Sequence, residues 1–461
     1  MDSERDGVPP GLMASRQAAG AVIACITINE VARRLARPER GPMGIRRTWM
    51  SVPPRDRLRR LVDLARVYRR WSRQQIAEAL GREASKVVPE SGNPKLDLVM
   101  ALSEAMNWEP GHVAQCVWHG HEAPDDPATA ARSLEELETE AALAEHAGQW
   151  LRLERLARAM RSRAQGGASR AMALHLSALA CAGDGRFAET LRHAQAGLRE
   201  MQVPARTQLL LMRDLACAHD ALGHLVESGA VATQMIARIG TSAHVPELRE
   251  CQACAFWIRG NSSRRRIDTD SALAPQHAAD ASADLHAAMR AYEGMARESS
   301  SLSAGAMAHR CAGALVECET VLGALSPEDG VRRIEAMLGA VIDVDEYPAG
   351  EWLESHGWWA IFGCMIAMRS MSGAPLQRAM AVFTNKAAEI AERVDSWSLR
   401  ERAFSLEHLR RGRASDEAGI EPEWLLDRDE MRMVAGAVGR FPAFREVGMD
   451  ILASARLLEP A

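Results

Sequence analysis

A segment that repeats every 37 or 38 residues constrains the fold of this chain most strongly. Three copies align on a glycine followed two positions later by a large apolar residue: Gly148-Gln149-Trp150, Gly185-Arg186-Phe187 and Gly223-His224-Leu225. Alanine fills one column before the glycine, at 141, 178 and 216, and one after it, at 157, 194 and 232. Antiparallel helices pack closely where small residues meet, so each copy is predicted to be a helix pair with the glycine in its turn.

Composition extends the helical prediction to the rest of the chain. Apolar residues make up 47% of the 461 residues but aromatic residues only 5%, so most of the apolar content is Ala, Leu, Met and Val. Alanine and leucine are strong helix formers, whereas a β-sandwich needs more β-branched and aromatic residues. We therefore expect an all-α protein, long enough for several domains or one elongated repeat array.

The repeat is similar to the tetratricopeptide repeat, with Ala178–Phe187 as its best copy. The period here is longer than that of the family, and the family's signature Trp, Tyr and final Pro are mostly absent. The similarity covers residues 135–240, with weaker pairs in 282–340 and 356–394. It implies an α-solenoid whose concave face binds a peptide or protein segment. An irregular helical bundle is the alternative for the C-terminal half.

A second pattern lies near the N-terminus, where Ser72 can cap a helix from Arg73 to Leu80 that Gly81 ends. This helix lies in the stretch Trp71–Gly81, and the loop Glu90-Ser91-Gly92-Asn93-Pro94 follows it. A further helix is expected over 95–106, with Leu96, Val99, Leu102 and Met106 on one side. Over residues 58–117 these features resemble the lambda-repressor-like helix-turn-helix family. The resemblance implies a small DNA-binding domain with a recognition helix in Arg82–Val88.

The same resemblance indicates which residues meet DNA: Arg73, Arg82, Ser85, Lys86 and Asn93. Recognition helices enter the major groove by their N-terminal residues. On such a helix Arg82 and Lys86, four residues apart, share one face. Arg73 stands where the family has Gln, and Pro89 shortens the recognition helix, so a module that no longer reads DNA is the alternative.

These patterns divide the chain into six parts. We expect a mostly disordered extension over 1–54, a helix-turn-helix-like domain over 55–120 and a linker over 121–131. Tetratricopeptide-like repeats follow over 132–260, then an exposed loop or insertion over 261–281, and further helical repeats and C-terminal helices over 282–461. Arg264-Arg265-Arg266 falls in the expected loop and is interpreted as solvated.

Several functional classes find no support in the sequence. No phosphate-binding loop, HExxH, GxSxG or kinase motif is present, so we expect no enzyme, no cofactor and no metal site. The nine cysteines are odd in number and follow no framework spacing, and Cys251 and Cys254 are interpreted as thiols on adjacent helical turns. No stretch approaches the ~20 apolar residues of a membrane span, which favours a cytoplasmic protein.

Charge is distributed unevenly. Residues 1–118 hold 19 Lys and Arg against 13 Asp and Glu, whereas the whole chain has a net charge of −5. A basic N-terminal segment on an otherwise acidic chain is typical of nucleic-acid contact by that segment. We expect a DNA-binding transcription regulator whose helical-repeat domain binds a peptide or protein, with double-stranded DNA as a partner, a homodimer as an open option and no membrane. The alternative is a non-enzymatic scaffold or adaptor.

Two aromatic and methionine-rich stretches complete the sequence prediction. His356 with Trp358-Trp359 is interpreted as a plug in the core. Met365, Met368 and Met371 recur at helical spacing and are predicted to be pliable packing or a peptide-binding face.

Overall fold

The computed structural model describes residues 54–69, 71–88, 95–106, 132–240, 246–299, 301–339, 350–418 and 424–457, together with residues 113, 117 and 344. These residues are helical almost throughout, which confirms the all-α prediction. One small parallel sheet was not predicted: β1 (Trp424–Leu426) pairs with β2 (Ala455–Leu457). The chain divides into a unit over 1–133 and a unit over 134–461. The expected extension, apart from Pro54, and the expected linker lie outside the described residues.

The N-terminal unit has three described helices: α2 (Pro54–Arg69), α3 (Arg73–Ala79) and α4 (Leu96–Met106). Ser72 caps α3 as predicted, because its hydroxyl accepts a hydrogen bond from the Gln75 amide while the Gln75 side chain accepts one from the Ser72 amide. Gly81 ends this helical segment with a φ of +62°, a conformation that suits glycine. The reciprocal cap and the glycine together confine α3 to two turns.

Two expectations for this unit were wrong. Arg82–Val88 forms turns rather than a helix, although the Lys86 amide donates to the Glu83 carbonyl and closes a single turn. Leu96, expected on the apolar side of α4, is exposed, and Leu98 takes its place in the core. The apolar core of the unit draws on all three helices and includes Leu58, Val62, Ala65, Ile76, Ala77, Leu98, Leu102 and Met106.

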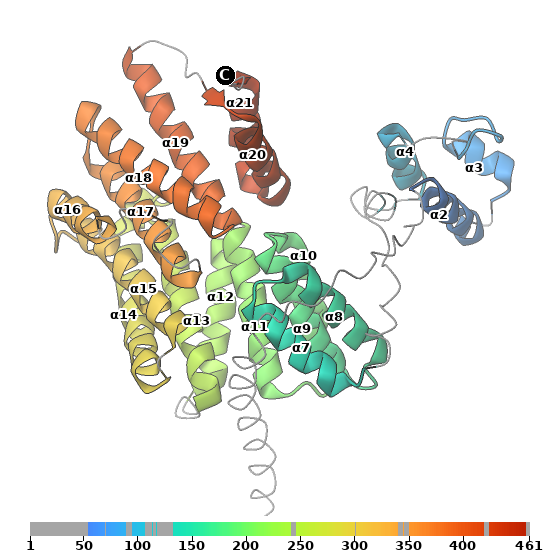
Figure 1. Ribbon diagram of the computed structural model, residues 1–461, viewed down its shortest axis with the longest axis horizontal. Coiled ribbons are helices and arrows are strands. Elements are labelled where there is room, and N and C mark those ends of the chain that lie inside the picture. Colours follow the sequence, from blue (N-terminus) through green and yellow to red (C-terminus); the bar gives the residue numbers. More distant parts are fainter. Residues whose placement is uncertain are drawn as a thin grey trace, which may run out of the picture. The chain divides into compact units, whose positions relative to one another are not determined.

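The C-terminal unit is a succession of helices, each packed against the next in sequence (Figure 1). The helices are α7 (Leu134–His146), α8 (Trp150–Arg163), α9 (Gly167–Gly183), α10 (Phe187–Leu198), α11 (Ala205–Ala221), α12 (Leu225–Ile239), α13 (Pro246–Arg266), α14 (Ala274–Ser299), α15 (Leu302–Val321), α16 (Pro327–Leu338), α17 (Glu351–Ser370), α18 (Gly373–Arg393), α19 (Trp397–Ala418), α20 (Arg428–Arg440) and α21 (Arg445–Ser454). Short 3-10 turns, η2 (Ser271–Leu273) and η3 (Pro442–Phe444), precede α14 and α21. Alternate helices also meet, because α11 contacts α9 and α13, and α17 contacts α15 and α19.

The repeated columns of the sequence lie at buried positions of the packed helices. All six alanines of the two columns are completely buried, at 141, 157, 178, 194, 216 and 232. Gly148, Gly185 and Gly223 have φ values of +63°, +72° and +82°, so each ends a helix in the left-handed conformation. The predicted roles of alanine at the contacts and glycine in the turns are confirmed.

A hydrogen bond repeats with the same period. The Thr190 hydroxyl of α10 donates to the Ala178 carbonyl, and the Ser228 hydroxyl of α12 donates to the Ala216 carbonyl. Each hydroxyl therefore ties the second helix of a pair to the buried alanine of the first. The two pairs are similar in polar contacts as well as in packing.

The expected loop over 261–281 is not a loop. Helix α13 continues through Arg266, and α14 begins at Ala274 after the short turn η2. Arg264, interpreted from sequence as solvated, is only 5% exposed. Its side chain lies over the Phe362 ring and pairs with Glu317, so ion pairing and stacking compensate for its burial. These contacts come from residues about 50 or more positions away, which local composition does not reveal.

One hydrophobic core extends from Ala216 to Leu406 and includes buried residues of α13, α15, α17 and α18. The helices after residue 282 thus share a core with those before it. None of the described helices is both long enough and apolar enough to cross a membrane.

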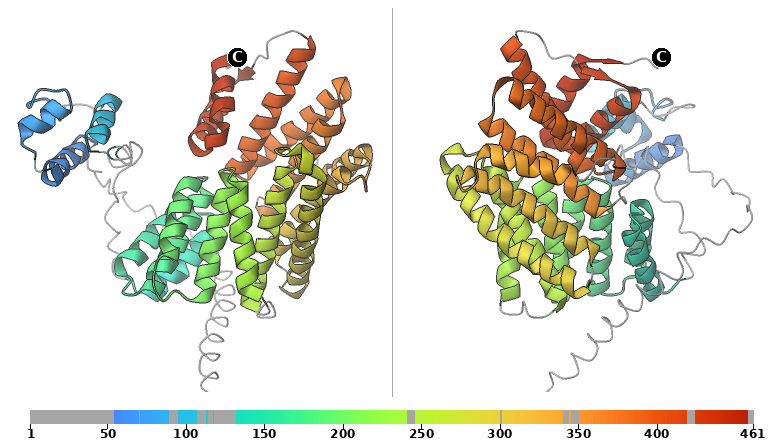
Figure 2. Two further views of the ribbon diagram at one scale, coloured as in Figure 1. Left: turned by 180° about the vertical axis from the view of Figure 1, so that it is seen from behind. Right: turned by 60° about the vertical axis from the view of Figure 1, so that its left-hand side comes forward.

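The C-terminal segment of the unit contacts the turn between α9 and α10, which lies far from it in sequence. Helices α20 and α21 lie beside α19 (Figure 1 and Figure 2). The Arg440 guanidinium donates to the Asp184 carbonyl at 3.0 Å, and the Phe441 ring lies 5.6 Å from the Phe187 ring. This contact joins the C-terminal segment 424–457 to the turn between α9 and α10.

We predict that Ala232→Leu destabilises the C-terminal unit by about 1–3 kcal/mol, because a close-packed helix contact has no room for three more carbons. Ala230→Leu, on an exposed position of the same helix, is the matched control and should change stability by no more than about 0.5 kcal/mol. Urea unfolding of the full chain followed by circular dichroism measures both. Equal unfolding midpoints for the two variants would contradict close packing at this column.

Candidate functional site

Four of the five residues predicted to contact DNA lie within the described part of the N-terminal unit, and the two arginines among them are already engaged. Arg73 donates from Nε to the Ala84 carbonyl at 3.0 Å. Arg82 donates to Asp97 of α4 at 3.0 Å, and its side chain is 27% exposed. Ser85 is exposed. The turn that replaces the expected helix therefore brings Arg73 and Arg82 against the protein's own acceptors.

Lys86 differs from the two arginines in its exposure. Its ammonium group is paired with Glu83 at 2.9 Å, yet 72% of the side chain is exposed, so the pair is solvated and weak. The expected common helix face of Arg82 and Lys86 is absent, because the segment is not helical. Asn93 lies outside the described residues.

The larger candidate site is a cavity of about 710 Å³ inside the C-terminal unit. Alternate helices supply most of its wall, namely α11, α13, α15, α17 and α19, and Phe187 and Phe441 add to it. We call it the inner cavity, and its characteristic side chains are Asp220, Trp257, Arg310, Trp358, Arg369 and Arg402. Clefts of this size are typical of sites for small ligands and short peptides.

Positive charge predominates in the lining. Six arginines line the inner cavity, at 264, 265, 310, 369, 402 and 413, against three carboxylates, at 220, 268 and 401. Charges that face a cavity with low-dielectric walls produce a strong local field. The excess of arginine therefore favours an anionic ligand.

Several of these arginines belong to an ion-pair network that joins the helices. Glu317 of α15, which is completely buried, pairs with Arg264 of α13 at 2.6 Å and with Arg369 of α17 at 2.8 Å. Arg265 pairs with Asp220 of α11 at 3.0 Å. Because each pair links different helices, the network orients the helices around the cavity as well as neutralising charge.

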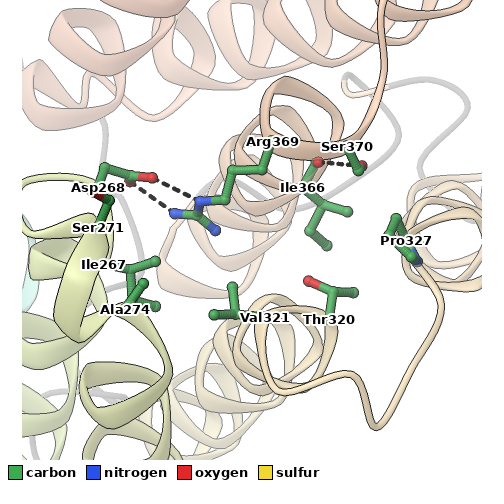
Figure 3. A pocket seen from close by; sticks show the side chains of 10 residues that line it. All are labelled: Ile267, Asp268, Ser271, Ala274, Thr320, Val321, Pro327, Ile366, Arg369 and Ser370. Atoms are coloured by element: carbon green, nitrogen blue, oxygen red, sulfur yellow. Dashed lines mark hydrogen bonds and ion pairs between the residues drawn. The ribbon is translucent and has the colours of Figure 1, made fainter.

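A smaller cavity of about 420 Å³ adjoins this network. Figure 3 shows the Arg369 guanidinium bound to the Asp268 carboxylate by two hydrogen bonds of 2.7 Å. Both residues line the smaller cavity and the inner cavity. The pair forms part of the wall between the two, and the rest of the smaller cavity is mainly apolar, with Ile267, Val321 and Ile366.

Arg310 is held differently from the arginines of the network. Its guanidinium lies between two indole rings, 4.9 Å from the Trp257 ring centre and 4.1 Å from that of Trp358. Among the residues that the structure describes, none accepts a hydrogen bond from Arg310 or forms an ion pair with it. Cation–π stacking thus supplies the close contacts of this cation.

The environment of Arg310 is unfavourable for a charge. Burial lowers the pKa of its guanidinium from the usual value, while the more distant carboxylates of Glu354 and Asp220 raise the pKa. Its Nε is buried without an acceptor, and so are Arg265 Nε and Arg369 Nη1. Three arginines of one cavity therefore carry a buried N–H group without an acceptor among the described residues.

Apolar side chains form the rest of the inner cavity. Met365 and Met368 of α17 line it together with Leu406 and Leu409 of α19. The first two belong to the methionine stretch that was predicted to be packing or a peptide-binding face. Methionine adapts its shape to irregular partners, so this part of the wall suits apolar side chains of more than one form.

Sequence reasoning missed the central residues of this cavity. Trp359 and His356 are buried as predicted, but Trp358 faces the cavity. Arg310 and Glu317 were not singled out, although both interrupt a helix that is otherwise built largely from small and apolar residues. A charged residue in such a helix needs a partner from another part of the chain. This rule could have identified Arg310 and Glu317 as candidates from the sequence.

No group of three or more potential metal ligands occurs within the described ranges. Cys251 and Cys254 lie one turn apart in α13, as predicted, and both are free thiols.

Comparison of the chain with protein-family models, with curated proteins and with solved structures gave no match.

We predict that Glu317→Gln lowers the free energy of unfolding by about 3–5 kcal/mol, because it leaves the buried Arg264 without a counter-charge and Arg369 with only Asp268. Glu319→Gln is the matched control on the same helix, since Glu319 is partly exposed and pairs with Arg333 at only 3.5 Å. Its effect should stay within about 0.5–1 kcal/mol. Chemical denaturation of both variants measures the free energy of unfolding. Equal decreases in the two variants would show that the buried Glu317 pairs stabilise the fold no more than an exposed pair does.

Proposed function

We propose that this protein is a ligand-responsive, DNA-binding transcription regulator of the cytoplasm. Its C-terminal unit is a tetratricopeptide-like α-solenoid that binds a peptide segment in the inner cavity. Its N-terminal unit is a helix-turn-helix-like module that binds double-stranded DNA. The observation that carries the proposal is the inner cavity, which is large enough for a ligand and is lined by arginine and aromatic side chains.

The repeated geometry supports the solenoid assignment. Buried alanines and left-handed glycines recur at the helix contacts and turns of the first three pairs. Gly323, between α15 and α16, has the same conformation at a φ of +70°, so the turn recurs later in the chain. Stacked helix pairs of this kind present the first helix of each pair on one face, and that face is the usual ligand surface of α-solenoids.

The N-terminal unit supports the DNA-binding part through its capped helix α3 and the left-handed Gly81. Arg73, Ser85 and Lys86 are exposed around this turn. Phosphate oxygens would compete with the Ala84 carbonyl for Arg73 and with the Glu83 carboxylate for Lys86. Such contacts position a protein on DNA without reading sequence.

A specific observation favours the alternative of a scaffold or adaptor. Arg82, the candidate for reading a base, is paired with Asp97, and its segment is not helical. Residues 82–88 in this conformation form no recognition helix that could insert into the major groove. In the scaffold alternative, the inner cavity keeps its ligand and the N-terminal unit binds no DNA.

A comparison of two lysine variants tests the DNA-binding proposal. Lys86→Ala should weaken binding to any duplex and reduce the slope of log affinity against log salt by about one unit, because one phosphate contact is lost. Lys386→Ala is the matched control, since this lysine also pairs with a glutamate three residues away but lies in the other unit. Fluorescence anisotropy of the full chain at two salt concentrations, on duplexes selected from a random pool, measures both.

Each result has a definite meaning. Binding by the wild type and the control, with a reduced salt slope for Lys86→Ala, supports the regulator. If the wild type binds no duplex at low salt, the regulator is refuted and the scaffold is the better description. An unchanged slope in Lys86→Ala removes that residue from the interface.

A further inference from the structure

We propose that Arg310 is the carboxylate-binding residue of the inner cavity, and that the ligand is a short peptide that presents this carboxylate. The inference rests on the proposed peptide-binding function and names the chemistry of its ligand. Four properties of the cavity lead to it: its size, its surplus of cations, the geometry at Arg310 and the apolar wall beside it.

The size of the cavity limits the ligand to a short segment. Its volume of about 710 Å³ lies inside the range of roughly 300–1,000 Å³ that small-ligand sites occupy. Phe187 and Phe441, whose rings pack together, add a wall that connects the C-terminal segment to α10. A few peptide residues fit this space, whereas a folded domain does not.

The charge distribution leaves Arg310 as the place for an anion. Within the network, Arg265, Arg369 and Arg264 are neutralised by Asp220, Asp268 and Glu317. Of the other cavity arginines, Arg402 pairs with Glu401 at 3.6 Å, and Arg413 donates to the Met368 carbonyl at 3.0 Å. Arg310 has no carboxylate partner among the described residues and sits between two rings instead. A guanidinium beside a cavity that has no carboxylate partner of its own is open to an acceptor supplied by a ligand.

The geometry at Arg310 selects a planar acceptor. The Trp257 and Trp358 rings lie 4.9 Å and 4.1 Å from the guanidinium carbon, so stacking engages its faces while its N–H groups remain for hydrogen bonding. Carboxylates bind the edge of a guanidinium with two parallel hydrogen bonds in the same plane.

The indole of Trp358 is itself fixed in place. Its Nε1 donates to Glu354 at 3.3 Å, and Ser396 at the start of α19 donates to the same carboxylate oxygen at 3.0 Å. The ring that covers Arg310 is therefore positioned before any ligand arrives. A preformed site of this kind loses little entropy on binding.

The wall of Met365, Met368, Leu406 and Leu409 lies in the same cavity and defines the rest of the ligand. It suits one or two apolar side chains close to the carboxylate. A carboxylate with apolar neighbours occurs at a peptide C-terminus or at an Asp or Glu within an apolar segment. The chemistry at Arg310 is common to both sources, and the experiment separates them.

The test uses the full chain and three libraries of random tetrapeptides. The first has free C-terminal carboxylates and no Asp or Glu, the second is the same but amidated, and the third is amidated with one Asp or Glu. Peptides retained by the protein are identified by mass spectrometry, and their dissociation constants are measured by calorimetry. Enrichment from the first library identifies a C-terminal carboxylate, and enrichment from the third identifies a side-chain carboxylate.

Three variants make the result specific. Arg310→Met keeps an apolar chain between the indoles but removes the charge, and should weaken binding about 10- to 100-fold. Arg310→Lys restores the charge without the two-pronged edge and should recover only part of this loss. Arg432→Met removes an exposed arginine outside the cavity that pairs only with Asp429, and should bind as the wild type does. Thermal unfolding by circular dichroism verifies that each variant is folded.

The outcomes separate the two levels of the proposal. If folded Arg310→Met binds as tightly as the wild type, or if the neutral amidated library is retained as well as the acidic ones, the carboxylate site is refuted and peptide binding stands. If the wild type retains no peptide from any library, the peptide-binding function is refuted together with this inference.

Discussion

The close approach of consecutive helices at alanine is the constraint on which the C-terminal unit depends. Each of the six alanines in the two repeated columns is completely buried, and the turns between the helices place glycine in a conformation that other residues adopt at a cost. A helix pair packed in this way cannot bury its remaining apolar surface alone, so it needs the next pair. The small alanine side chain, a single methyl group, thus allows the close helix contacts from which the succession of helices is built.

Alternate helices meet along one side of the unit, and their side chains line the inner cavity. In this protein many of those side chains are charged. Removing charges from water is unfavourable, and a buried pair often stabilises a fold no better than apolar residues of the same volume. The pairs that Glu317 makes with Arg264 and Arg369 are thus better explained by the orientation they give to three helices. Arg310, stacked between Trp257 and Trp358, then lies in a frame that the network has already fixed.

Local regularities were predictable from the sequence, whereas the site was not. The helix cap at Ser72, the glycine turns and the alanine columns are all short-range patterns, and the repeat together with the composition predicted the all-α fold. The interpretation of 261–281 as a loop failed, because Arg264 is buried through partners on helices distant in sequence. The absence of a helix at Arg82–Val88 and the position of Arg310 likewise depend on contacts that no local window contains.

The contact between Arg440 and Asp184 has a consequence for the order of folding, since it joins positions 256 residues apart. The helix pairs make mainly local contacts and can form as the chain is synthesised, at about 5–20 residues per second. Phe441 can reach its place in the cavity wall only after α20 has left the ribosome, on the order of tens of seconds after Asp184 emerges. The wall of the inner cavity is therefore completed late in synthesis, and a nascent chain has its first helices before it has the complete cavity.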